Sequence, residues 1–262
     1  MFFRLSSLAL GLVLLAFVVG ATVLGHLVGR ALRSRSDGFR EPLAVLQAAL
    51  LGVVGLILAF GLALAVGRYE SRRAAVVAEA NAIGTTYLRA QTLAEPIRSR
   101  SLERLVSYTD TSIRLSHAVP DSDAARAALD DGQELQRELW GLAGQALADA
   151  PTASAPRLYV ETLNEMIDMQ TVRASALNNR VPAAVLWLDV LAAAVALGLL
   201  AAYLALLGRG VLTSVLGAAL VSVLLLVIFD LDRPTRGMIT VPDTPLTNLR
   251  ASMDLPPAAS PP

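Results

Sequence analysis

The chain has 262 residues, of which 55% are hydrophobic and 17% are charged, with 22 basic and 22 acidic residues. A soluble globular protein is closer to about 25% charged. Because the charges balance, the chain has no strong field for nucleic acid or an anionic surface. It also has no cysteine, which excludes disulfides and thiolate catalysis.

Most of the apolar residues lie in four runs, and each run reaches the roughly 20 residues that cross a bilayer. The runs exclude a soluble enzyme, a secreted disulfide scaffold and a nucleic-acid-binding protein. The first run exceeds the roughly 7–15 apolar residues of a signal peptide, so we expect a retained helix. The predicted spans are about 5–29, 43–67, 183–207 and 210–229.

The hydrophilic segment between the second and third spans is predicted to form four helices. Val76, Ala80, Ile83 and Tyr87 recur at the spacing of one helix face. Several helices in a short segment favour an antiparallel bundle. No proline separates the second span from the first of these helices, so we expect one continuous helix from about 43 to 93.

The predicted fold class is therefore an all-α integral membrane protein with four transmembrane helices and an inserted helical bundle. The predicted parts are a transmembrane hairpin at 1–67, an extramembrane four-helix segment at 68–180, a transmembrane hairpin at 181–230 and an extramembrane tail at 231–262. The tail is rich in proline and alanine, so we expect disorder after about 251.

Asp189 is the one charged residue inside the four apolar runs. Ionisable groups within spans commonly serve a function, so a pore, proton or ion contact is one interpretation. The other is a solvated position at the membrane interface beside Trp187. The third span is longer than a bilayer requires, which favours the interfacial position.

The fourth span carries small and hydroxylated residues on one face. Ser214, Ser222 and Asp230 lie on this face at multiples of four residues. The face predicts either a wetted path or hydrogen bonding between helices. Asp232 follows Asp230 closely, and two carboxylates could hold a hard cation or pair with nearby arginines. Asp230, Asp232, Ser222, Ser214 and Asp189 are therefore the candidate pore or ion contacts.

Glycine and alanine also form stripes along the first two spans. Such stripes permit close helix contact in lipid, which is the favoured interpretation, and lining of a conduit is the alternative. In the first span the stripe is Ala21, Gly25 and Gly29, and in the second it is Ala44, Ala48, Gly52, Gly55, Ala59, Ala63 and Gly67.

The sequence has no recognisable catalytic constellation. His26 and His117 are far apart, and without cysteine they predict no zinc site. A Ser/His/Asp set, a glycine-rich phosphate loop and an HExxH motif are also missing. We therefore predict neither an enzyme nor a cofactor or metal.

The arginines give conflicting signals about orientation. The loop between the first two spans carries more arginines than the residues before the first span, which predicts that the loop is cytoplasmic. The bundle would then be periplasmic. Arginines beside the membrane ends on the bundle's side argue the reverse, but long domains count less in this rule. The counts favour a periplasmic bundle.

Two motifs resemble one bacterial family of membrane proteins, the bestrophin-like proteins. The first motif runs from Arg68 to Arg89, and the second runs from Leu231, through Asp232, Arg233 and Gly237, to Met253. Bestrophins are pentameric anion channels with four spans per subunit and a helical cytosolic domain between the second and third. The resemblance covers essentially the whole chain and implies a homo-oligomeric channel in a bacterial inner membrane, a pentamer by analogy. It places the bundle in the cytosol, against the arginine counts.

The motif residues suggest a polar network among helices, and a ligand or ion contact is the alternative. The candidates are Arg68, Glu79, Asn81, Thr85, Tyr87, Arg89 and Arg233. The leading functional hypothesis is an ion channel or pore whose ion the sequence does not identify. The rival hypothesis is a non-conducting sensor or scaffold in which the bundle binds a ligand or partner.

Overall fold

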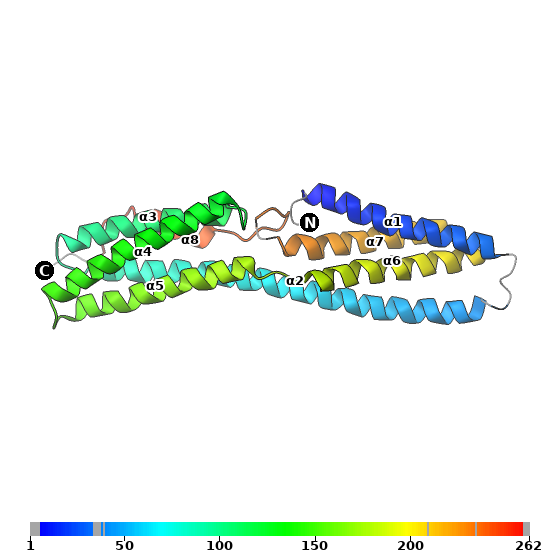
Figure 1. Ribbon diagram of the computed structural model, residues 1–262, viewed down its shortest axis with the longest axis horizontal. Coiled ribbons are helices and arrows are strands. Elements are labelled where there is room, and N and C mark those ends of the chain that lie inside the picture. Colours follow the sequence, from blue (N-terminus) through cyan, green and yellow to red (C-terminus); the bar gives the residue numbers. More distant parts are fainter. Residues whose placement is uncertain (1–5, 34–37, 39, 209, 234, 259–262) are drawn as a thin grey trace. The chain divides into compact units, whose positions relative to one another are not determined.

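The computed structural model describes residues 6–33, 38, 40–208, 210–233 and 235–258. Within this part of the chain the regular structure is entirely α-helical, which confirms the predicted fold class (Figure 1). The predicted start of the first span, at residue 5, lies outside the described residues. The helices are α1 (Ser7–Leu32), α2 (Arg40–Ala90), α3 (Ile97–His117), α4 (Asp123–Asp149), α5 (Ser154–Asn178), α6 (Ala183–Leu206), α7 (Val211–Leu231) and α8 (Thr244–Ser252).

The chain divides into two compact units. The membrane unit comprises Met1–Tyr69 and Arg180–Thr240, and the bundle unit comprises Glu70–Asn179 and Val241–Pro262. Helix α2 has 51 residues and contributes to both units, as expected for a sequence with no helix breaker at the end of the second span.

Among the described residues, four helical stretches are long and apolar enough to cross a membrane. They are α1, α2, α7 and the stretch Ser154–Leu206, whose apolar part is α6. Each lies where the sequence places a span, and the chain is a multi-pass helical membrane protein.

In the membrane unit α1 packs along α6 and α7. Glycine makes the contact with α6 close. A Cβ atom on Gly25 would overlap the carbonyl oxygen of Gly198, and one on Gly29 would overlap that of Ala202. Backbones approach in this way where small residues face each other in lipid. Leu10, Leu14 and Val18 are buried beside these contacts.

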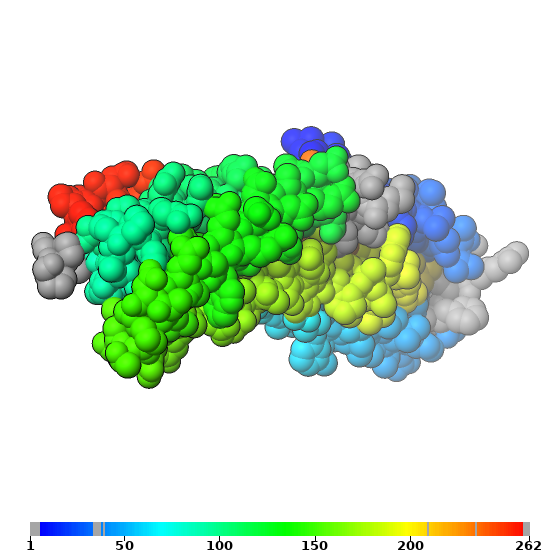
Figure 2. All heavy atoms as spheres, turned by 60° about the vertical axis from the view of Figure 1, so that its left-hand side comes forward, coloured from blue at the N-terminus to red at the C-terminus, as the bar shows by residue number. Residues whose placement is uncertain are grey.

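The bundle unit is built from the end of α2 together with α3, α4 and α5. Ser122 caps α4 by accepting a hydrogen bond from the Ala125 N–H at 3.2 Å, which satisfies an exposed donor of the first turn. The buried core of the unit includes Ile83, Leu105 and Leu139. Figure 2 shows α3 and α4 packed against each other on one face of this unit.

Helix α8 is a feature that the sequence analysis did not predict. It packs on α3, and Leu246 is buried in the core of the bundle unit. Met253 is also buried, with 6% of its surface exposed. The apolar residues Leu246, Leu249 and Met253 recur at helical spacing and bury one face of this segment.

Candidate functional site

The end of α7 carries the two carboxylates that the sequence suggested as a cation site. Asp230 accepts hydrogen bonds from the Ser7 hydroxyl at 2.9 Å and from the Ile239 N–H at 2.8 Å. Asp232 accepts one from the Val181 N–H at 2.9 Å. The two side chains therefore bind different partners. Each holds a neighbouring chain segment in place at this end of the membrane unit.

Gly237 and Arg233 support this arrangement. A Cβ atom on Gly237 would lie 2.7 Å from an Asp230 carboxylate oxygen, so a larger residue would displace the carboxylate or the loop. Arg233 is 3% exposed. Burial lowers the pKa of its guanidinium, and the charge of Asp230 opposes that shift. Residues of the second motif thus form a buried charged cluster beside the end of α7.

The hydroxylated face of α7 points into the membrane unit. Ser214, Ala218 and Ser222 are each at most 5% exposed. The Ser214 hydroxyl donates to the Gly210 carbonyl at 2.9 Å, and the Ser222 hydroxyl donates to the Ala218 carbonyl at 2.7 Å. These bonds stay within α7 and satisfy the hydroxyls locally. In a single copy, this face packs against other helices of the unit.

Asp189 lies in the second turn of α6 and is fully buried. Its carboxylate packs directly against Gly61 of α2, where a Cβ atom would overlap it. Neither carboxylate oxygen has a hydrogen-bond donor among the described residues. The sequence allows an interfacial or an internal position, and in a single copy the side chain is enclosed by protein.

The bundle unit contains a buried ion pair between Glu79 of α2 and Arg173 of α5. Ser112 of α3 donates to the other Glu79 carboxylate oxygen at 3.1 Å. Arg173 also donates to the Ser112 carbonyl at 3.0 Å and to the Ser116 hydroxyl at 2.6 Å. The ion pair is thus hydrogen-bonded to a third helix. Removing either partner would leave the other as an uncompensated buried charge.

A second polar group extends the network to α4. Gln136 donates to the Tyr108 hydroxyl at 3.2 Å and to the Gln170 side-chain oxygen at 2.6 Å. Burial raises the pKa of Tyr108, and the nearby charge of Glu79 raises it further. Gly132 leaves room for the Gln170 amide, which a Cβ atom would overlap. Together the two groups connect all four long helices of the unit.

The other residues of the first motif have varied positions. Tyr87 donates to the Met253 carbonyl at 3.2 Å and so holds the C-terminal segment. Partial burial raises its pKa. Asn81 and Thr85 are exposed, and the Thr85 hydroxyl donates to the Asn81 carbonyl within α2 at 3.0 Å. Arg68 and Arg89 are half-buried. Of the predicted network, Glu79 is the member inside the core.

Two buried residues of the first motif, Arg72 and Thr86, were not among the candidates for the polar network. Arg72 is 2% exposed and donates to the Ala176 carbonyl at 3.3 Å and the Asn179 carbonyl at 2.9 Å, at the end of α5. Cations favour helix C-termini. Thr86 donates to the Thr162 carbonyl at 2.9 Å. Both extend the stripe that Val76 and Ile83 define, and this periodicity was the available signal.

The small-residue stripe of α2 in the membrane unit has a different environment from that of α1. Ala48, Ala59 and Ala63 are exposed, as are Gly52 and Gly55 between them, whereas Gly61 lies on the buried side of the helix. A Cβ atom on Gly52, Gly55 or Gly67 would meet no described atom within 4 Å. The opposite side of α2 is buried at Val54, Leu58 and Ala65. One face of α2 packs within the unit, and its glycine face is uncovered.

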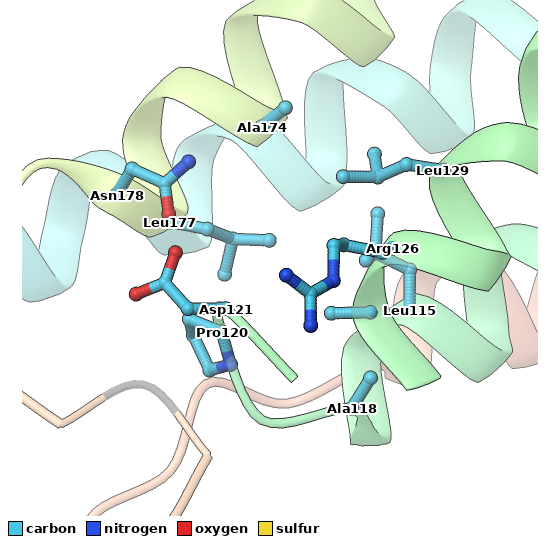
Figure 3. A pocket seen from close by; sticks show the side chains of 10 residues that line it. Leu115, Ala118, Pro120, Asp121, Arg126, Leu129, Ala174, Leu177 and Asn178 are labelled. Carbon is cyan, nitrogen blue, oxygen red and sulfur yellow. The ribbon is translucent and has the colours of Figure 1, made fainter. Parts of the chain in front are cut away.

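The bundle unit also has a small pocket of about 80 Å³. Figure 3 shows Leu115, Leu129 and Leu177 along its wall, with Asp121 and Arg126 among the polar side chains at its edge. The pocket lies where the α3–α4 connection meets the end of α5. Its size admits a few water molecules or a very small apolar group.

The two histidines lie outside both the charged cluster at the end of α7 and the polar network of the bundle unit. His117 contacts the Asp243 carboxylate at 3.0 Å on the bundle surface, and His26 is half-buried in α1. No group of three or more metal-ligating side chains occurs among the described residues.

The comparisons with known proteins agree on one fold. The chain matches the family described as Bestrophin-like domain over residues 11–246. It superposes on a crystal structure of a bacterial bestrophin homolog from Klebsiella pneumoniae with a TM-score of 0.66 and 14% identity, covering 90% of this chain and 97% of that chain. A tryptophan-to-alanine mutant of that homolog gives a TM-score of 0.64 and 16% identity, covering 92% and 95%. A comparison with curated proteins found no match.

Proposed function

Because this chain belongs to the bestrophin-like domain family, we propose that it assembles with copies of itself into a membrane pore that conducts ions. The observation that carries this proposal is the uncovered glycine face of α2. Small residues on a lipid-facing surface favour close contact with another helix. Copies that meet through α2 around an axis would place this helix at the centre of the assembly, in a pentamer by analogy with bestrophins.

The proposal assigns new roles to the residues first suspected of lining a path. Ser214, Ser222 and Asp230 are buried within a single copy, and Glu79 is ion-paired in the bundle core. In this proposal these residues stabilise the single subunit and do not line the central axis. Among the candidates, Asp189 lies closest to the helix that we place at the axis, because it packs behind α2 at Gly61. Its carboxylate has no hydrogen-bond donor among the described residues.

Ion flux tests the proposal directly. The protein is reconstituted into liposomes that are loaded in turn with chloride, sodium and potassium. We expect flux from the unaltered protein and at least a tenfold loss in Gly55→Leu, because a side chain there would obstruct close packing or the path. Gly20→Leu is the matched control, since Gly20 of α1 also has open space around it among the described residues. Absence of flux for all three ions would contradict the proposal.

We place the pore in a bacterial inner membrane with the bundle in the periplasm, on the strength of the arginine counts. The chain has no cysteine, so one introduced residue gives an unambiguous label. Asp123→Cys lies on the exposed surface of the bundle, where the native side chain is 97% exposed. Labelling of intact cells by an impermeant maleimide is expected. Labelling only after lysis would place the bundle in the cytoplasm.

A non-conducting sensor is the second candidate function, and the pocket in Figure 3 favours it. A ligand with a short apolar part would contact Leu115 and Leu177, and its polar end would lie near Arg126. Thermal stabilisation by short-chain carboxylates, lost in Ala174→Phe, would support this function if liposome flux is also absent. Ala174 lines the pocket, so a phenyl ring there would fill it.

A further inference from the structure

A second surface of the membrane unit is hollow and differs in character from the glycine face of α2. It is a groove of about 650 Å³ between α1 and α7. Ligand sites in proteins commonly enclose roughly 300–1,000 Å³. Small residues, Gly11, Ala219 and Ser222, lie along it, and large apolar residues, Leu8, Leu12 and Val223, border them. These three large side chains are 75%, 57% and 58% exposed.

The groove has one polar end. Ser7 lines it there and donates to the Arg236 carbonyl at 3.2 Å, and Met238 lines it two residues farther along the chain. The Arg236 side chain is exposed and forms no ion pair within the described residues. The Asp230 carboxylate at the end of α7 is 1% exposed and already accepts hydrogen bonds from Ser7 and Ile239. The accessible charge at the end of the groove is therefore positive.

The polar end coincides with helix termini. Helix α1 begins at Ser7 and α7 ends at Leu231. A helix of 26 residues, such as α1, is about 39 Å long, whereas the hydrocarbon core is about 30 Å thick. The terminus of α1 thus reaches the headgroup level, and the groove continues from there into the hydrocarbon region.

We infer that this groove binds one acyl chain of an anionic phospholipid, with the lipid phosphate beside Arg236. Apolar walls and a cation at headgroup level complement the two parts of such a lipid. The exposed Arg236 favours a lipid over a second copy of the chain, because a phosphate would neutralise this cation at headgroup level. The inference concerns the outer surface of the membrane unit and does not depend on ion conduction.

Native mass spectrometry of the detergent-purified full chain tests the site. The probes are phosphatidylglycerol and phosphatidylcholine with identical acyl chains, and the readout is the number of lipids retained per chain. We expect tighter binding of phosphatidylglycerol. Arg236→Gln should reduce that preference by roughly fivefold, the effect of one cation near an anionic lipid. Arg137→Gln, an exposed arginine on α4, is the control.

A second pair of variants tests the groove itself. Val223→Trp should fill the groove and weaken binding of both lipids by about tenfold, because several methylene groups lose their apolar contact. Val215→Trp is the matched control, since Val215 is 50% exposed on the same helix but does not line the groove. Both tryptophans lie on exposed positions, so the fold should tolerate them.

Three outcomes would overturn the inference. Equal losses in Val223→Trp and Val215→Trp would show unspecific lipid around the helices. If Arg236→Gln kept the full preference for phosphatidylglycerol, the lipid phosphate would not lie beside Arg236. Loss of the oligomer in Val223→Trp, without loss of lipid, would show that a second copy occupies the groove. Failure of the pore proposal would appear separately, as missing flux with lipid binding intact.

Discussion

The bundle unit and the membrane unit differ in where two kinds of residue find their partners: buried polar residues in the bundle unit and glycines in the membrane unit. In the bundle unit several buried polar residues have partners on neighbouring helices, as Glu79 has in Arg173 and Ser112. In the membrane unit glycines make the closest helix contacts, as at Gly25 and Gly29. Yet the same residue type is uncovered on α2, at Gly52 and Gly55. The bundle unit pairs its buried charges within one chain, whereas the membrane unit leaves the glycine face of α2 uncovered.

The largest expected effect concerns the ion pair in the bundle unit. Glu79→Gln leaves the buried charge of Arg173 without its partner, so we expect a loss of about 3–5 kcal/mol in the free energy of unfolding. The measurement is chemical unfolding in detergent followed by circular dichroism. The double variant Glu79→Leu with Arg173→Leu should lose much less than the sum of the single variants. Additive losses would contradict the assigned partnership.

The second prediction compares two glycines of α1. Gly25→Leu forces a side chain into the backbone of α6, so we expect a loss of about 3 kcal/mol in the stability of the membrane unit. Gly20→Leu should change stability by less than about 0.5 kcal/mol, because its surroundings are open. Thermal unfolding of both variants in the same detergent checks the difference. Similar midpoints would mean that the α1–α6 contact is looser than described.

The third prediction concerns alkaline pH. Burial raises the pKa of Tyr159 to about 12. A tyrosine with a raised folded-state pKa stabilises the fold fully below its unfolded pKa, about 10, and this contribution disappears as the pH rises through 12. We therefore expect a loss of about 2 kcal/mol between pH 10 and 12 from this residue. The loss of unfolding free energy across that range should be about 2 kcal/mol smaller in Tyr159→Phe and unchanged in Tyr203→Phe. The buried Tyr108, whose pKa is also raised, contributes to the slope that remains.

The smallest expected effect concerns the C-terminal segment. Tyr87→Phe removes the hydrogen bond to the Met253 carbonyl, which should destabilise the attachment of α8 by about 1 kcal/mol. Hydrogen exchange of the α8 amides should rise roughly fivefold, while amides around Leu105 stay protected. Equal acceleration in both places would mean that α8 unfolds only together with the bundle core.

The sequence predicted the helices well because their signals are local. Apolar runs of sufficient length mark the spans, and Val76, Ile83 and Tyr87 mark a bundle helix through their spacing. The partner of Glu79 was not predictable, since Arg173 lies 94 residues away and the pairing depends on tertiary packing. Helix α8 is short, with 9 residues, and its proline-rich surroundings resemble a disordered tail.

The glycine stripes show a second feature that the sequence does not predict, which is the partner against which a helix packs. The sequence favoured close packing for both stripes, and a residue pattern alone carries no information about which partner a helix faces. The structure gives Gly25 and Gly29 partners within the same chain and leaves Gly52, Gly55 and Gly67 open among the described residues. The same pattern therefore serves two surfaces with different neighbours.

The central claim is that the α2 face binds other copies of the chain. Native mass spectrometry of the protein in lipid nanodiscs tests it most directly, with Gly52→Leu and Gly20→Leu measured alongside. We expect one closed oligomer larger than a dimer, retained in Gly20→Leu and weakened about tenfold or more in Gly52→Leu. A monomer, or an oligomer that Gly52→Leu leaves unchanged, would contradict it.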